Sequence, residues 1–160
     1  IIWCMFVDSI RNLAHTLENQ GIRTRCIYGE VPLDERLEIL DAFRNGEIQV
    51  LLTNPHTLAE SVSLHSVCHD AVYFEYSYNL VHLLQSKDRI HRLGLPKNQY
   101  TQYYFHQIFY ETENGSWSMD EAVYQRLQEK EKIMLDAIDN HVLEAMPTSE
   151  EDLEIIFAKL

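Results

Sequence analysis

The sequence predicts an α/β protein built on a parallel sheet, and two observations support that prediction. Short apolar runs of strand length recur through the first 110 residues, and amphipathic stretches of helix length separate most of them. Strands and helices that alternate at such intervals form parallel sheets with right-handed crossovers. The first run, residues 1–7, is apolar without alternation, which is typical of a strand buried on both faces.

The next three elements follow from helix caps and apolar spacing. Asp8 or Ser9 can cap a first helix, which Gly21 ends. A second strand is expected over residues 23–28, and an amphipathic helix over residues 33–44. The inward-facing stripe of that helix is predicted to consist of Leu37, Leu40 and Phe43.

The rest of the sheet is expected in three strands and one helix: strands over 48–53, 71–75 and 100–106, and a helix over 79–93. Gly94 and Pro96 are suited to end that helix. Parallel sheets bind ligands at the carboxyl ends of their strands. The loops after Thr53 and Glu75 are therefore the expected places for functional residues.

The pattern changes after residue 110, so we divide the chain into a sheet domain, 1–110, and an acidic helical extension, 111–160. Residues 111–116 are polar and turn-like. A capping box, 118–121, opens a helix expected over 119–145, and a short acidic helix is expected over 150–159. This extension carries 13 acidic and four basic side chains. We interpret it as a solvated surface with one buried stripe.

The strongest motif is the ten-residue stretch from Gln85 to Gly94, which has the form Q-x-x-D-R-x-H-R-x-G. On a helix, Arg89 and Arg92 would project from nearly the same face. Two guanidinium groups placed so can clamp a triphosphate that another surface supplies, and Asp88 could hold one of them. The alternative interpretation is a solvated basic helix end that the helix dipole stabilises.

This stretch resembles motif VI of the Swi/Snf-type ATPases of helicase superfamily two, whose usual form is Q-A-x-D-R-x-H-R-I-G-Q. Four other segments resemble the family's motifs in the same order: 2–7 (motif IV), Tyr28-Gly29 with Arg36 and Phe43 (G-x(n)-R-x(n)-F), 50–64 (motif V) and 78–80 (W-N-P). The resemblance covers roughly residues 1–145. It implies a RecA-like parallel sheet with flanking helices, which would be the C-terminal motor lobe of an ATP-dependent DNA helicase or translocase.

The resemblance also implies a set of site residues. Arg89 and Arg92 would be arginine fingers for ATP and Mg²⁺, both held mainly by the N-terminal RecA-like lobe of the same protein. The residues expected beside the nucleotide are Gln85, Asp88, Glu60 and Ser61. The residues expected to contact the backbone of double-stranded DNA are Ser9, Thr53, Asn54, Ser63 and Asn79.

Two departures from a complete motor are visible in the sequence. The family's motif V is glycine-rich, A-G-G-x-G-x-N-L, whereas residues 57–64 contain no glycine, and Ser61 and Ser63 could donate hydroxyl groups instead. This indicates a divergent prokaryotic branch. None of the five glycines precedes a lysine, so the chain has no P-loop. We therefore expect it to be part of a longer protein and to hydrolyse no ATP alone.

Two other functions remain open. An RNA helicase lobe is one, although its motif VI usually ends in G-R-x-G-R, whereas D-R-x-H-R favours the double-stranded DNA branch. A degenerate RecA-like scaffold that binds proteins is the other.

Asp120-Glu121 imitates a magnesium-binding box but is better explained as the first turn of a capped helix.

Composition limits the remaining possibilities. A net charge of −12 argues against a wholly nucleic-acid-binding surface. His65 and His69 have no partner at the spacing of a zinc site, so no metal site is predicted. The three cysteines form no C-x-x-C pair and are expected to be free thiols in the cytoplasm. No apolar run is long enough for a membrane span.

Overall fold

The computed structural model describes residues 1–58, 62–92, 95–113, 115–140 and 147–158. The chain forms two compact units. The first comprises Ile1–Tyr76 and Val81–Phe105, and the second comprises Ser77–Leu80 and His106–Leu160. Among the described residues, no helix is both long and apolar enough to cross a bilayer.

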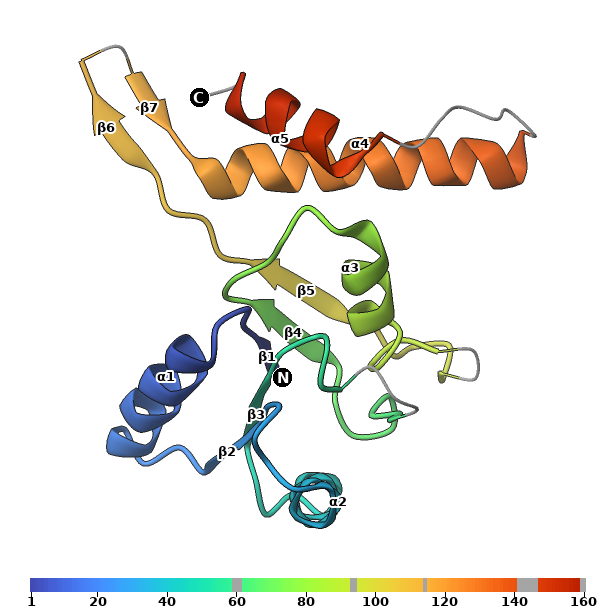
Figure 1. Ribbon diagram of the computed structural model, residues 1–160. Coiled ribbons are helices and arrows are strands. Elements are labelled where there is room, and N and C mark those ends of the chain that lie inside the picture. The colour runs from blue at the N-terminus through green and yellow to red at the C-terminus, as the bar shows by residue number, and fades with distance from the viewer. Residues whose placement is uncertain (59–61, 93–94, 114, 141–146, 159–160) are drawn as a thin grey trace. The chain divides into compact units, whose positions relative to one another are not determined.

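A five-stranded parallel sheet forms the first unit, with the strand order β2-β3-β1-β4-β5. The strands are β1 (Ile2–Trp3), β2 (Thr24–Ile27), β3 (Val50–Thr53), β4 (Asp70–Tyr73) and β5 (Gln102–Phe105). The helices that accompany them are α1 (Val7–Asn19), α2 (Leu33–Arg44) and α3 (Leu80–Lys87). One face of the sheet is covered by α1, and the other by α2 and α3 (Figure 1). The predicted parallel sheet with flanking helices is confirmed.

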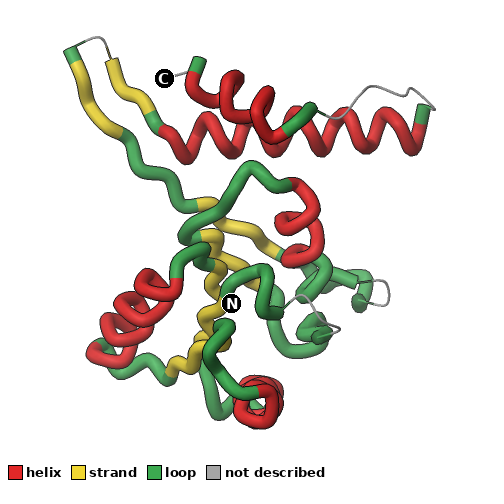
Figure 2. The backbone as a smooth tube through the Cα atoms, in the orientation of Figure 1, coloured by secondary structure: helices red, strands yellow, loops and turns green. Residues whose placement is uncertain are grey.

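Successive strand residues face opposite sides of the sheet, which places apolar side chains in two cores. On one face, Cys4 and Leu52 pack against Ile10 and Ala14 of α1. Trp3 faces the opposite side and is fully buried. The connection from β3 to β4 contains turns but no described helix or strand (Figure 2).

The first strand is shorter than predicted, and the helix after it begins earlier. The strand β1 ends at Trp3, and α1 begins at Val7 with Phe6 as its N-cap. The cause is the Glu75 carboxylate, whose Oε2 accepts hydrogen bonds from the backbone N–H groups of Met5 (3.0 Å) and Phe6 (3.2 Å). Those two N–H groups are therefore withdrawn from the sheet, and the predicted caps Asp8 and Ser9 lie inside the helix.

The second helix has the predicted bounds, and two of the three residues predicted to face inward, Leu40 and Phe43, are buried. Ile39, Leu40 and Phe43 are buried, whereas Leu37 is 55% exposed. Ile39 and Phe43 are four residues apart and therefore lie on one side of the helix. The spacing of three was wrong only for Leu37, and Ile39 completes the buried face in its place.

The second unit contains a hairpin and two helices. The hairpin pairs β6 (Tyr110–Thr112) with β7 (Gly115–Trp117) antiparallel, where the sequence indicated only a turn. Tyr110 and Trp117 stack across it with ring centroids 4.9 Å apart. The sequence signal was weak because each strand has only three residues.

The helices of the second unit are α4 (Met119–Asp139) and α5 (Ser149–Phe157). The Ser118 side chain accepts a hydrogen bond from Glu121 N, so the predicted N-cap is confirmed. The expected ends of these helices, beyond residue 140 and beyond residue 158, lie outside the described residues. The solvated acidic surface expected here is wrong in one respect, because Asp152 is only 2% exposed and binds both Arg126 and Lys130.

Candidate functional site

The predicted arginine site lies where α3 ends. The helix stops at Lys87, so the expected helix through residue 93 is wrong. Arg89 N donates to Ser86 O at 3.2 Å in a tighter turn, and Leu64 N donates to the Arg89 carbonyl at 2.7 Å. That carbonyl is therefore engaged outside the helix. Arg89 and Arg92 do not stand one turn apart on a regular helical face.

The arginines also lie at the other edge of the sheet from the one expected. A crossover helix runs antiparallel to its strands, so its C-terminal end lies at their amino ends. His91 confirms this, because its Nδ1 is 3.2 Å from the Thr101 hydroxyl, directly before β5. Arg89 and Arg92 therefore follow α3 at the amino edge of the sheet, and not at the carboxyl ends of the strands, where functional residues were expected.

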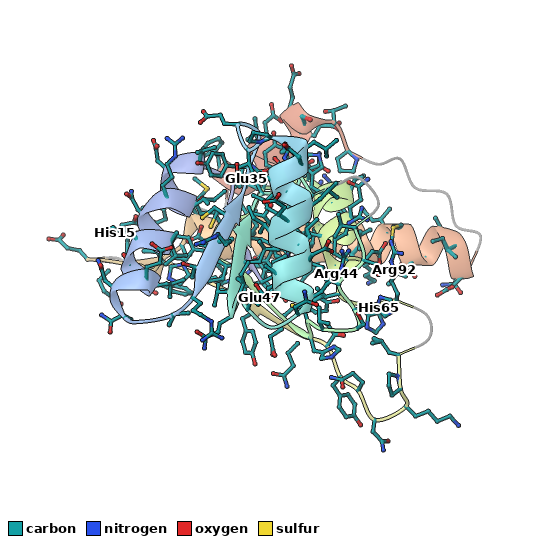
Figure 3. All side chains as sticks on the ribbon, turned by 90° about the horizontal axis from the view of Figure 1, so that it is seen from below. His15, Glu35, Arg44, Glu47, His65 and Arg92 are labelled. Carbon is teal, nitrogen blue, oxygen red and sulfur yellow. The ribbon has the colours of Figure 1, made fainter. Side chains whose placement is uncertain are left out.

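The two guanidinium groups differ in exposure. Arg89 is 8% exposed, and its Nη1 donates to the Val62 carbonyl at 3.5 Å. Arg92 is exposed, and its Nε donates to the Asp88 carbonyl at 3.2 Å. Arg92 and His65 lie on the flank of the molecule away from α1 (Figure 3). Arg89 is thus built into the protein, whereas Arg92 is available to another molecule.

The electrostatics of the pair favour an anion. Burial lowers the pKa of Arg89, and the positive charge of Arg92 lowers that pKa further, while Asp88 acts in the opposite direction. The two positive charges therefore repel each other. A phosphate group bound by both would remove that repulsion and gain charge-assisted hydrogen bonds.

The other predicted nucleotide residues fall into two groups. Gln85 on α3 and Asp88 in the turn after it are exposed, close in the chain to the arginines. Glu60 and Ser61 lie outside the described residues. The segment before them is held by Asn54, whose Oδ1 accepts from Thr57 N at 3.0 Å.

The residues predicted to bind nucleic acid differ in exposure and in the contacts that they make. Thr53 and Asn54, at the end of β3, are 0% and 9% exposed, so the Thr53 side chain has no surface to offer a ligand. Ser9 Oγ donates to Glu75 Oε1 at 2.5 Å. Ser63 Oγ is 2.6 Å from His65 Nδ1. Asn79 belongs to the second unit, and its N–H donates to Ser77 Oγ at 3.3 Å.

Sequence reasoning missed the role of Glu75. Its carboxylate lies at the carboxyl edge of the sheet and serves the N-terminus of α1, where a negative charge is favoured. The available signal was an acidic residue at the end of the apolar run over residues 71–75. The contact between His56 and His82, with ring centroids 4.2 Å apart, had no such signal.

A family comparison covers most of the sheet unit. Residues 1–94 match the family described as "Helicase conserved C-terminal domain". The proteins called ATP-dependent RNA helicase RhlB in Xanthomonas axonopodis and Xanthomonas campestris are 29% identical over 85 residues, which is 53% of this chain. The chain spans only 14% and 13% of the length of those two proteins.

Solved structures share the fold at low sequence identity. The C-terminal part of the Fun30 ATPase domain has a TM-score of 0.66 and 15% identity, over 98% of this chain and 45% of that one. A variant of S. cerevisiae Dbp5 bound to RNA and ADP BeF3 has a TM-score of 0.62 and 17% identity, over 98% and 37% of the two chains. Both likenesses support the expected RecA-like architecture.

Proposed function

This chain belongs to the family of helicase conserved C-terminal domains, and from that membership we propose that it is the second motor lobe of an ATP-dependent, superfamily-two helicase or translocase. An N-terminal RecA-like lobe of the same protein would be its partner and would carry the P-loop. ATP, with Mg²⁺, supplies the phosphoanhydride bond whose hydrolysis drives the motor. The Swi/Snf-type branch remains part of this proposal, on the strength of the Q-x-x-D-R-x-H-R-x-G stretch.

The observation that carries the proposal is the unequal arginine pair. Arg92 is exposed and can reach phosphate oxygens that another lobe presents. Arg89 is buried beside it and adds positive potential while holding the Val62 carbonyl. An arginine finger accelerates phosphoryl transfer by about 10³–10⁵-fold. We assign that role to Arg92 first, and Arg89 would support it from within the lobe.

The nucleic acid is proposed to be double-stranded DNA, contacted through its backbone. The D-R-x-H-R sequence at residues 88–92 favours this class. RNA is the second candidate, because the curated relatives at 29% identity are called RNA helicases. A comparison of ATP hydrolysis with duplex DNA and with RNA, at one stated salt concentration, separates the two.

The decisive experiment replaces Arg92 with Ala in the full-length protein. We expect nucleic-acid-stimulated hydrolysis to fall by about 10³-fold or more while ATP binding is retained. Arg25→Ala, at an exposed position of β2, is the matched control and should leave turnover unchanged. Undiminished turnover in Arg92→Ala would refute the finger. If the full-length protein without substitutions binds no nucleotide, the chain is better explained as a degenerate RecA-like scaffold that binds proteins.

A further inference from the structure

A short segment of the second unit is inserted between β4 and α3 of the first. The segment Ser77–Leu80 groups with the C-terminal helices, whereas the chain up to Tyr76 and from Val81 onward groups with the sheet. Leu80 is also the first residue of α3. The segment is therefore covalently continuous with the helix that precedes the arginines.

Lys130 of α4 holds this segment. Its Nζ donates to the Tyr78 carbonyl at 3.1 Å and lies 5.8 Å from the centroid of the Tyr78 ring. The Lys130 side chain is only 10% exposed. A buried ammonium group replaces its water shell with fixed partners, so these contacts define one position for the segment.

Asp152 of α5 fixes Lys130 in turn. Its Oδ2 accepts from Lys130 Nζ at 2.6 Å, and its Oδ1 accepts from Arg126 Nε at 2.8 Å. Arg126 has a further partner in Glu129, at 2.8 Å from its Nη1. The network therefore has two halves. Lys130 joins α5 to the Tyr78 backbone, whereas no described contact of Arg126 reaches Tyr78.

We propose that Lys130 is a positioning residue for the ATP site. By holding the Tyr78 carbonyl, it fixes the point at which α3 begins, and the orientation of α3 sets the place of Arg89 and Arg92. The C-terminal helices thereby regulate hydrolysis rather than serve as a solvated appendage. This inference rests on the proposed motor function, because it concerns the rate at the same site.

Two substitutions in the full-length protein separate positioning from simple stability. Lys130→Met keeps the aliphatic stem but removes the donors to Tyr78 and Asp152, whereas Arg126→Met breaks the other half of the network. A catalytic group displaced by about 1 Å can cost up to about 10²-fold in rate. We expect Lys130→Met to lower kcat by about tenfold at little-changed KM for ATP. Lys130→Arg should recover most of the rate, and Arg126→Met should leave kcat near that of the unaltered protein.

Amide hydrogen exchange tests the same inference without reference to activity. Lys130→Met should speed exchange in Leu80–Lys87 and in residues 88–92, and Arg126→Met should not. Equal exchange in the two variants, or equal losses of kcat, would overturn the positioning role. If Arg92→Ala keeps full turnover, the motor function fails, but the exchange result still decides whether Lys130 positions α3.

Discussion

Ser9 and Glu75 are 66 positions apart in the chain, and the Ser9 hydroxyl donates to the Glu75 carboxylate at 2.5 Å. The same carboxylate accepts from the backbone N–H groups of Met5 and Phe6. It therefore links the carboxyl ends of β1 and β4 to the residues that lead into α1. A negative charge there also favours the helix dipole.

Glu75→Ala is expected to destabilise the sheet unit by about 1–3 kcal/mol, because two exposed backbone N–H groups and the part-buried Ser9 hydroxyl lose the charged acceptor that they share. Chemical denaturation followed by fluorescence of the buried Trp3 measures this change. Ser9→Ala removes one hydrogen bond and should cost only about 0.5–1.5 kcal/mol. If the Glu75→Ala protein is as stable as the unaltered one, water accepts these hydrogen bonds in place of the carboxylate with no loss of stability.

Arg89→Met tests whether the buried arginine is structural as well as electrostatic. The substitution leaves the Val62 carbonyl without this donor, so we expect a loss of stability of about 1–3 kcal/mol, together with reduced hydrolysis. Arg92→Met should reduce hydrolysis with little change in thermal stability, because Arg92 is exposed. Thermal unfolding and ATP turnover are measured on both variants. Equal stability of the two variants would show that Arg89 contributes no more to the fold than Arg92 does.

Asp152→Ala should destabilise the second unit strongly. It leaves Arg126 and Lys130 buried without their shared carboxylate, and breaking such a buried arrangement costs about 3–5 kcal/mol. Loss of helical circular dichroism at lower denaturant concentration measures the effect. Glu129→Ala, which affects a carboxylate that is 44% exposed, is the control and should change little.

The sheet was predictable because its signals are local, whereas the site depends on contacts distant in sequence. The apolar runs and helix stops located five strands and α2 to within a few residues. Nothing local showed that the Leu64 N–H would engage the Arg89 carbonyl and that the regular helix would end at Lys87. The charge count of the extension likewise could not show that Asp152 would be buried between two cations.

Buried thiols make the stability of the sheet unit sensitive to alkaline pH. Burial, with a smaller effect of Glu75, raises the pKa of Cys4 to about 12, and burial raises the pKa of Cys26 to about 11. Above the ordinary thiol pKa of 9.0, the unfolded chain releases these protons while the folded protein retains them. Stability should therefore fall as pH rises from about 9, by up to about 1.4 kcal/mol per pH unit for each thiol.

Thermal unfolding between pH 8 and 10.5 measures this dependence. The Cys4→Ala and Cys26→Ala variants should show a shallower decline than the unaltered protein, even where the substitution itself lowers stability. Tyr73 adds to the same trend, because burial also raises the pKa of its phenol. A decline of equal steepness in the doubly substituted protein would show that the two thiols do not cause the effect.

The contact between His56 and His82 predicts the opposite dependence at acidic pH. Burial lowers the pKa of His82, and His56 lowers it further. The folded protein therefore resists protonation of His82, so the stability that this group contributes is present at neutral pH. It is lost as pH falls through the ordinary histidine value of 6.5. His56→Ala should raise the pKa of His82 towards that value, although burial keeps part of the shift. Titration of the imidazole resonances by NMR, with His82→Gln for assignment, tests this, and an unmoved His82 titration would show that burial accounts for all of it.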